Sequence, residues 1–208
     1  MPQRDPVSRV TALQHFRTTA PDPAFEDRLR GYVRGREGLR GLAGGSTLRL
    51  LAPDAGYLRL DRWEGMNELV RSTHAEGYLP RLADAAGPAA VDLHLMVSVG
   101  RMPATVPLGE AGRVTVVRAS VAERPVRFEL DFGALVGHCV TAGDYGGSEL
   151  LRSVTDPRAY TGLLWWRPGG AGEPEPGTVS TPGFVKRAAE LSVSAEVAEF
   201  HAVPVGGA

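Results

Sequence analysis

The 208-residue sequence predicts an α+β protein made of two tandem domains, each with the element order β-α-β-β-α-β. Three observations support this prediction: an internal repeat, the succession of strand-like and helix-like segments, and strands that are apolar on both faces. The repeat is the clearest of the three. A Gly-Gly-Ser segment at Gly44 leads to Trp63, and another at Gly146 leads to Trp166. The offset is 102 residues at the glycines (146 − 44) and 103 at the tryptophans (166 − 63), which is about half of the chain.

The first half is predicted to contain a strand, a helix, two strands, a helical region and a final strand. Asp22 and Pro23 begin the helix, because aspartate is a favoured N-cap and proline is favoured at the first helical position. Apolar residues at helical spacing follow the proline, and a glycine-containing segment ends the helix. The expected strands are residues 10–16, 46–51, 57–63 and 91–99, and the helical region is 64–86.

The second half repeats this order. Its expected strands are residues 114–121, 148–154, 160–166 and 195–203, and its expected helices lie near 125–139 and 182–192. The order is that of the ferredoxin-like arrangement, an antiparallel sheet with both helices on one face. The segment between the halves is rich in Gly and Pro and lacks periodicity. We therefore expect domain 1 over residues 8–99, a linker over 100–112 and domain 2 over 113–205.

The strands carry apolar residues on both faces. Leu58 and Leu60 alternate with Tyr57 and Trp63, so a lone ferredoxin-like sheet would leave one apolar face in water. Two such sheets in one chain can cover each other. The sequence therefore predicts two tandem ferredoxin-like domains packed sheet to sheet as a single-chain pseudo-dimeric α+β barrel, with the helices outside and room for a cavity between or beneath the sheets.

Composition excludes several classes of function. The net charge of −1 gives no basis for binding nucleic acid or an anionic membrane. Cys139 is the only cysteine, so no intrachain disulfide can form. No apolar run approaches the ~20 residues of a membrane-spanning helix, and the polar N-terminus is unlike a signal peptide. A cytoplasmic protein that acts on small molecules is the expectation, either as the intramolecular pseudo-dimer alone or as a further homodimer.

Short motifs in both halves resemble a known family. Trp63 precedes Glu64–Leu69 and His74–Tyr78, and the second half carries Asp156–Tyr160 and Leu163–Trp166 in the corresponding order. This pattern resembles the antibiotic biosynthesis monooxygenase family of dimeric α+β barrels. The resemblance implies a small oxygenase that converts an anthrone or hydroquinone intermediate of aromatic polyketide type into a quinone. It also implies that molecular oxygen is the co-substrate and that no cofactor or metal is used.

The catalytic candidates are His74, His15, Asn67 and Trp63. Oxygenation of a phenol needs a base that removes its proton, and histidine titrates near neutral pH. The resemblance places His74 near the mouth of the cavity, and His15 lies in the first strand. Asn67 follows Trp63 by four positions and could hold a substrate carbonyl or phenol.

The substrate-binding candidates are Arg59, Asp61, Tyr57, His94 and Trp166. The first three share strand parity with Trp63, so all four side chains fall on one face of the strand. On that face Arg59 could stabilise a phenolate and Asp61 could orient a histidine. An exposed Arg59–Asp61 ion pair is the alternative interpretation.

The two halves differ at the histidine positions, so they are not expected to form equivalent catalytic sites. Ala119 aligns with His15 and Ser180 aligns with His74, so domain 1 is the expected site. Two other functions remain open at this point. One is a polyketide cyclase of the same fold, and the other is a non-catalytic protein that binds and shields an aromatic intermediate. Haem degradation ranks lower, because no histidine is clearly placed as an axial ligand.

Overall fold

The computed structural model describes residues 9–18, 22–51, 56–140, 144–168 and 195–205. Along the chain these residues form β1 (Val10–Arg17), α1 (Pro23–Arg34), β2 (Leu42–Leu50), β3 (Gly56–Trp63), α2 (Met66–Thr73), α3 (Tyr78–Ala86), β4 (Ala90–Met102), the 3-10 helix η1 (Leu108–Glu110), β5 (Arg113–Val121), α4 (Pro125–Val140), β6 (Tyr145–Ser153), β7 (Ala159–Trp166) and β8 (Ala195–Pro204). Asp22 caps α1 through a 3.0 Å hydrogen bond that its carboxylate accepts from the Ala24 amide, and Pro23 is the first helical residue, as predicted.

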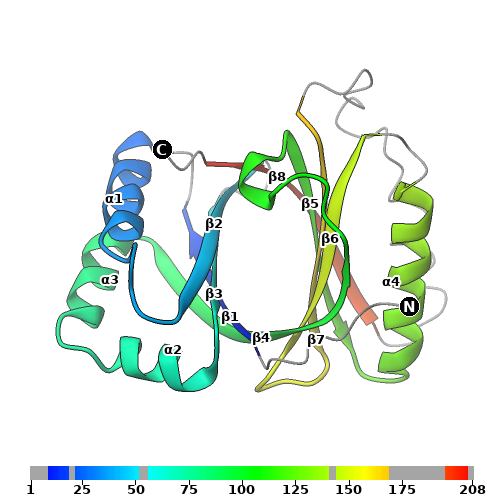
Figure 1. Ribbon diagram of the computed structural model, residues 1–208, viewed down its shortest axis with the longest axis horizontal. Helices are drawn as coiled ribbons and strands as arrows, with labels where there is room; N and C mark the ends of the chain where they lie inside the picture. The colour runs from blue at the N-terminus through cyan, green and yellow to red at the C-terminus, as the bar shows by residue number, and fades with distance from the viewer. Residues whose placement is uncertain (1–8, 19–21, 52–55, 141–143, 169–194, 206–208) are drawn as a thin grey trace.

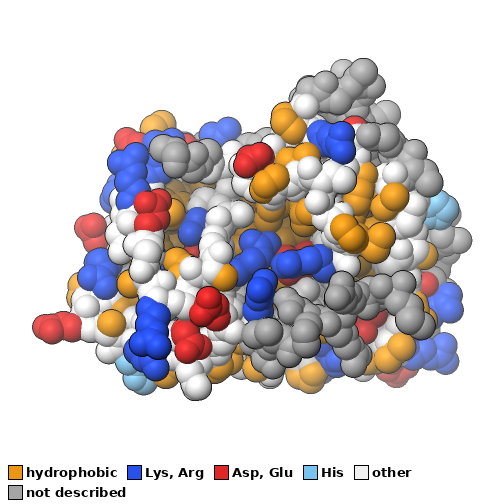
Figure 2. Space-filling view, in the orientation of Figure 1, with side chains coloured by type: hydrophobic (Ala, Val, Ile, Leu, Met, Phe, Trp, Pro, Cys, Tyr) orange, Lys and Arg blue, Asp and Glu red, His pale blue; other side chains and the backbone are white. Residues whose placement is uncertain are grey.

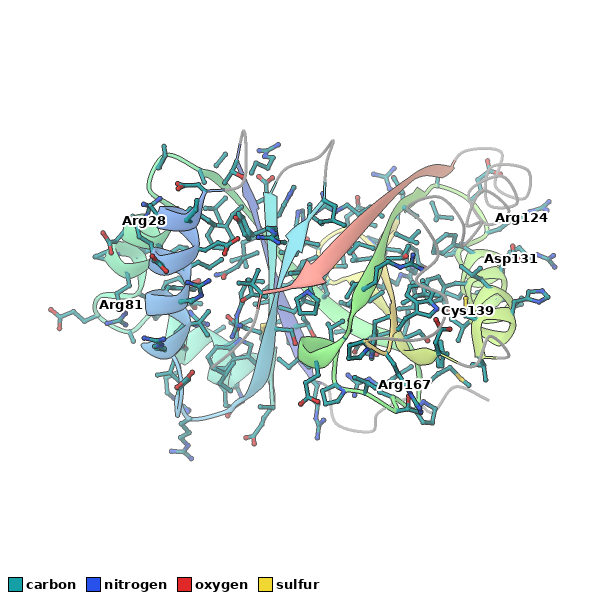
Figure 3. All side chains as sticks on the ribbon, turned by 90° about the horizontal axis from the view of Figure 1, so that it is seen from above. Arg28, Arg81, Arg124, Asp131, Cys139 and Arg167 are labelled. Carbon is teal, nitrogen blue, oxygen red and sulfur yellow. The ribbon has the colours of Figure 1, made fainter. Side chains whose placement is uncertain are left out.

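The strands close into one antiparallel barrel in the order β1-β3-β2-β8-β5-β7-β6-β4, and β4 pairs back with β1. The barrel is seen nearly end-on in Figure 1, with α1, α2 and α3 on one side and α4 on the other. Figure 3 gives the same arrangement from above, with Arg28 on α1 and Asp131 on α4 at opposite flanks. None of the helices in the described ranges is long and apolar enough to cross a membrane.

The prediction of two tandem ferredoxin-like domains packed sheet to sheet is wrong. The strands of both halves belong to a single closed sheet. β4 pairs with β6 from Met96 opposite Ser153 to Met102 opposite Ser148, and β2 pairs with β8 near Leu48. The edge strands of each half therefore satisfy their backbone N–H and C=O groups with strands of the other half, and this removes the free edges that two separate sheets would retain.

Two further predictions concern the segment between the halves and a helix near the C-terminus. Residues 100–112, predicted as a linker, contain the end of β4, which pairs with β6, and then η1. The helix predicted near 182–192 lies outside the described residues. The domain boundaries at 8–99 and 113–205 remain a prediction.

Strand alternation separates an inner core from outer ones. Leu58 and Leu60 of β3 join Leu163 and Trp165 of β7 in a core inside the barrel. On the opposite face of β3, Trp63 packs with Leu69 of α2, and Tyr57 packs with α1. The outer face of β3 therefore lies under the three N-terminal helices, and this position defines the candidate site.

Candidate functional site

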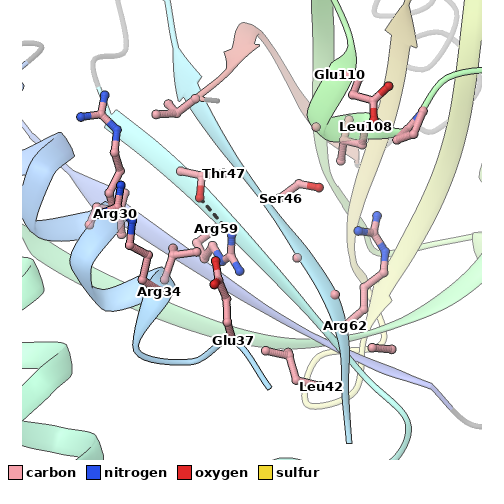
Figure 4. Close-up of a pocket in the computed structure, with 18 of the residues that line it drawn as sticks. Arg30, Arg34, Glu37, Leu42, Ser46, Thr47, Arg59, Arg62, Leu108 and Glu110 are labelled. Atoms are coloured by element: carbon pink, nitrogen blue, oxygen red, sulfur yellow. Dashed lines mark hydrogen bonds between the residues drawn. The ribbon is translucent and has the colours of Figure 1, made fainter. Parts of the chain in front are cut away.

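A pocket of about 1150 Å³ crosses the first half of β2, between α1 on one side and η1, β6 and β7 on the other (Figure 4). Figure 2 shows this face of the molecule hollowed, with hydrophobic side chains in the hollow and basic side chains beside them. Alternation along β2 divides the pocket in two. We call one part the helix-side lobe, which is lined by Leu29, Val33, Glu37, Thr47 and Arg59. We call the other part the barrel-mouth lobe, which is lined by Ser46, Arg62, Arg101, Leu108, Glu149 and Trp165.

A buried ionic chain ends at the wall of the helix-side lobe. The Asp61 side chain is fully buried, with Oδ1 2.7 Å from Arg59 Nε and Oδ2 3.0 Å from Arg36 Nη2. Arg59 Nη1 also donates to Thr47 Oγ1 at 3.1 Å. Of the three charged residues Arg59 lines the pocket, so the carboxylate of Asp61 and the guanidinium of Arg36 lie behind it.

Gly45 makes this arrangement possible. A Cβ added at Gly45 would lie 2.7 Å from Arg59 Cζ and 2.8 Å from Asp61 Oδ1, both too close for a real side chain. The bare backbone of β2 thus leaves room for the Arg59 guanidinium against the sheet. The Gly-Gly pair that marks the internal repeat has a local role in the first half, because it accommodates the ionic chain.

Three aromatic rings surround the second arginine of this chain. The Arg36 guanidinium carbon lies 5.0 Å from the ring centroid of Tyr32 and 5.6 Å from those of Trp63 and Tyr78. Its Nη1 donates to the Tyr32 hydroxyl at 2.7 Å. A desolvated cation over an aromatic face gains roughly 2 kcal/mol, so these contacts offset part of the cost of burying Arg36. The rings come from α1, β3 and α3, and the cage therefore ties both helices to the sheet.

Gln14 of β1 continues the network. Its Nε2 donates to the Tyr32 hydroxyl at 3.1 Å and lies 3.5 Å from the Tyr78 hydroxyl. Burial raises the pKa of Tyr32 well above its usual range, although the nearby Arg36 charge acts in the opposite direction. The Tyr32 phenol is therefore protonated at neutral pH, and it can accept from Arg36 and Gln14 but cannot act as a base.

Several buried polar atoms in this network have no hydrogen-bond partner among the described residues. They are Gln14 Oε1, Arg36 Nε and Trp63 Nε1, whereas Asp61 Oδ2 has the Arg36 guanidinium 3.0 Å away as its ion-pair partner. Buried polar atoms are nearly always hydrogen-bonded. Each buried polar atom that lacks a hydrogen bond lowers the stability of the fold by about 1–3 kcal/mol. Three such atoms in one cluster indicate a place where water or polar groups of a ligand are expected. The cluster lies directly behind Arg59 and the helix-side lobe.

The structure brings together some of the residues predicted for the site. Trp63, Asp61, Arg59 and Tyr57 lie on the helix-facing side of β3, as strand parity indicated, and all four are buried. The exposed ion pair considered for Arg59 and Asp61 is therefore not what forms. Tyr57 lies at the far end of this row, where its hydroxyl donates to Glu26 Oε1 at 2.9 Å.

Other predicted residues lie apart from this cluster. Asn67 and His74 are exposed on α2 and at its C-cap. His15 and His94 share strand faces with Leu13 and Met96 of the inner core, and therefore lie on the barrel side of the sheet. Trp166 packs on the α4 side. Catalytic or binding roles for these five residues remain predictions.

Sequence reasoning did not identify several members of the cluster. Arg36 follows the C-cap of α1, and Gln14 and Tyr32 resemble ordinary strand and helix residues. A weak signal existed for Gln14, because it is a polar residue on the same strand face as the apolar Ala12 and Phe16, which pack on the helix side of the sheet. Trp165 lines the barrel-mouth lobe, and the choice between it and Trp166 depends on which face of β7 is inside.

His15 carries a testable pH dependence. Burial, as the largest cause, and the positive charge of Arg118 together lower the pKa of His15 to about 4, although Asp92 acts in the opposite direction. The unfolded chain therefore binds a proton near pH 6.5 that the folded chain binds only near pH 4. The neutral imidazole stabilises the fold fully above pH 6.5, and this contribution is lost as the pH falls from about 6.5 to about 4.

Replacing His15 by glutamine should therefore flatten the decline of stability over that interval. The expected difference is about 1–2 kcal/mol between pH 7 and pH 4, a figure reduced for partial solvent exposure of the ring. Urea denaturation at pH 7, 5.5 and 4 measures it, with His138→Gln on the exposed face of α4 as the matched histidine control. Parallel pH profiles for the wild type and His15→Gln would contradict the prediction.

Comparison with known proteins gives the fold a context. No family model matches the chain, and no curated protein sequence matches it. Solved structures do match over nearly the whole length. An anthrone oxidase-like protein aligns with TM-score 0.64 and 14% identity over 95% of this chain and 92% of its own. A Lactobacillus acidophilus protein assigned as a monooxygenase aligns with TM-score 0.62 and 7% identity over 95% and 94%.

A third match corrects the expectation that no cofactor is used. A haem-binding protein from Thermus thermophilus aligns with TM-score 0.56 and 14% identity over 97% of this chain and 95% of its own. Proteins of this fold therefore include haem binders, and the fold does not imply cofactor-free chemistry. The described residues that line the pocket do not fit haem, because they include no His, Cys, Tyr or Met side chain to ligate iron.

Proposed function

We propose that the protein is an oxygenase that converts a phenolic polycyclic compound, of anthrone or hydroquinone type, into a quinone. The observation that carries this proposal is Arg59, which lies at the wall of a 1150 Å³ pocket with a buried carboxylate and a second arginine behind it. Oxygenation of a phenol requires its anion, and a guanidinium held in a fixed position at low dielectric favours that anion.

The helix-side lobe would hold the aromatic ring. Leu29 and Val33 of α1 provide an apolar wall, and Arg59 faces them across the lobe. The hydrogen bond from Arg59 to Asp61 fixes the guanidinium, so little reorganisation is needed when the substrate oxygen becomes charged. The unpartnered Trp63 Nε1 and Gln14 Oε1 would provide further polar contacts for a substrate that reaches behind Arg59.

Glu37 would accept the proton that the bound phenol loses. This carboxylate lines the helix-side lobe and makes no hydrogen bond or ion pair within the described residues, whereas Glu26 is held by Tyr57 and two arginines. Asp61 is unsuited to the task, because both of its oxygens face arginines. Glu37 is exposed to solvent, and Arg59 supplies most of the driving force by making the bound phenol more acidic.

The overall reaction is balanced without an external reductant. An anthrone CH2 becomes a C=O group: the ring carbon gains one oxygen atom from O2, and its two hydrogens leave as water with the second oxygen atom. The substrate supplies the four electrons that reduce O2. The balance is the same whether the electrons pass to O2 directly or through a cofactor.

The comparisons support this class of reaction without assigning the substrate. Structures of the same fold include the anthrone oxidase-like protein and the Lactobacillus acidophilus protein assigned as a monooxygenase. An aromatic phenol also suits a pocket whose walls combine leucine and valine side chains with arginine and glutamate side chains, because the former contact the ring and the latter its oxygens.

The test is oxygen consumption with a hydroxylated anthrone, measured with an oxygen electrode alongside the quinone absorbance. We expect one O2 to be consumed per quinone formed, at a rate at least about tenfold above that of heat-denatured protein. Parallel reactions contain EDTA or added haemin, and they identify any cofactor requirement separately from the reaction itself.

Three results would contradict the proposal. Uptake no faster than autoxidation under all conditions, including added haemin, would exclude the oxygenase function. Ring closure of an open polyketide-type substrate without O2 uptake would identify a cyclase. Saturable binding of the anthrone with slower autoxidation than in buffer would identify a protein that shields its ligand.

A further inference from the structure

The barrel-mouth lobe contains a buried acidic group held by two arginines from different strands. Glu149 of β6 has a side chain that is 2% exposed. Its Oε2 lies 2.9 Å from Arg62 Nη2 of β3, and its Oε1 lies 2.7 Å from Arg101 Nη2 of β4. Burial alone would raise the pKa of Glu149, but the charges and hydrogen bonds of the two arginines hold it below its ordinary value. The three groups therefore carry one net positive charge.

The arginines retain donors that the protein does not use. A guanidinium has five N–H groups, and each of these two makes one hydrogen bond, to Glu149, within the described residues. Arg62 and Arg101 are 21% and 42% exposed at the side chain, so the unused donors reach the lobe. Figure 4 shows the Arg62 guanidinium extending from β3 into the space beneath Leu108. Within the described residues Arg62 forms its ion pair with Glu149 and none with Glu110.

An apolar wall faces these donors. The Trp165 side chain is fixed by a 2.8 Å hydrogen bond from its Nε1 to the Val106 carbonyl, so its polar atom is already satisfied. Leu108 of η1 is 5% exposed and packs with Trp165 in the inner core. The flat indole and Leu108 therefore offer a surface suited to a planar ring.

A neutral donor completes the lobe. Ser46 of β2 is 8% exposed, lines the pocket and makes no side-chain hydrogen bond within the described part of the chain. Figure 4 shows its hydroxyl directed toward the Leu108 side of the pocket. Two cationic donors, one hydroxyl and one aromatic wall converge on one space.

We propose that the barrel-mouth lobe is a binding site for aromatic carboxylates. The ligand carboxylate binds Arg62 and Arg101 through their unused N–H groups and accepts from Ser46, and the ring lies against Trp165 and Leu108. Glu149 holds the two guanidinium groups at a fixed spacing, so they are arranged before the ligand arrives. This site is distinct from the helix-side lobe and does not depend on turnover.

The test is isothermal titration calorimetry with two probes of nearly equal shape, 2-naphthoate and neutral 2-naphthamide. The wild-type chain should bind naphthoate at least about tenfold more tightly, because charge-assisted hydrogen bonds are worth roughly 1.5–3 kcal/mol. Arg62→Gln should remove this preference. Arg34→Gln, an exposed arginine that lines the helix-side lobe, should keep it and is the matched control.

A second variant covers the case in which Arg62→Gln disturbs folding. Ser46→Ala leaves the ionic group intact, and it should weaken naphthoate binding at least about tenfold, because it removes a hydrogen bond to a charged acceptor. Equal affinity of the wild type for the two probes would overturn the proposal. So would a loss of naphthoate binding in Arg34→Gln with unchanged binding in Ser46→Ala and Arg62→Gln, because the carboxylate would then lie in the helix-side lobe.

Discussion

Replacing Asp61 by alanine should lower the free energy of unfolding by about 3–5 kcal/mol. The change leaves Arg36 and Arg59 buried with no carboxylate between them, and a buried cation without its partner is far more costly than the loss of a whole ion pair. The aromatic cage of Arg36 remains, but its ring contacts cannot replace a carboxylate. Equilibrium denaturation in urea measures the effect.

A matched aspartate shows whether the effect comes from burial. Asp156 also pairs with an arginine, Arg158, but both side chains are well exposed, and Asp156→Ala should leave the denaturation midpoint nearly unchanged. Asp61→Asn should fall between the two, because an amide can still accept one hydrogen bond. If Asp61→Ala proved no more destabilising than Asp156→Ala, the ionic chain would not be the buried structural element described above.

Replacing Arg59 by glutamine should reduce kcat/KM for the anthrone about 100-fold. Glutamine keeps an N–H donor near the position of the arginine Nε but removes the charged guanidinium that stabilises the phenolate, and loss of one such donor in other enzymes costs a factor of ~10²–10³. The reduction should appear mainly in kcat, because the charge develops after binding. Initial rates of quinone formation, with folding checked by circular dichroism, measure it.

A second variant moves the Arg59 guanidinium without removing it. A Cβ at residue 45 would collide with Arg59, so Gly45→Ala should displace the guanidinium and reduce kcat/KM at least about tenfold. Gly31→Ala on α1 is the control, because a Cβ there meets no heavy atom within 4 Å. Full activity in both Arg59→Gln and Gly45→Ala would remove Arg59 from the reaction while leaving the question of oxygen uptake to the assay itself.

The part of the candidate site that could be predicted from the sequence is the set of residues that share one face of a strand, because that set follows from the two-residue period of the strand. Alternation along β3 placed Tyr57, Arg59, Asp61 and Trp63 on one face, and the structure keeps them there. Asp22 and Pro23 likewise begin α1 through contacts within three residues. The rest depended on side chains distant in sequence. Arg36 reaches Asp61 across 25 positions (61 − 36), and nothing in the residues around it distinguishes a buried arginine from an exposed one.

Histidine was the feature on which sequence reasoning depended most, because its pKa suits proton transfer. The structure gives another explanation for the two strand histidines: His15 and His94 share faces with inner-core residues of β1 and β4. Burial and Arg118 make His15 a weak base, and neither residue lines the pocket. Residue type indicated a possible role, but the side of the sheet decided the location.

The sequence by itself determined the strands and helices of the first half and the residues that share each strand face, because these follow from local backbone preferences and from the two-residue period of a strand. The tertiary structure alone decided that the strands close into one barrel. The pairing of β4 with β6 joins residues about 50 positions apart. Its hydrogen bonds are between backbone groups, so the side chains alone do not indicate which strands pair. Closure also decided which face is inside. It thereby placed Arg59 and Asp61 under the helices and Arg62, Arg101 and Glu149 together at the barrel mouth.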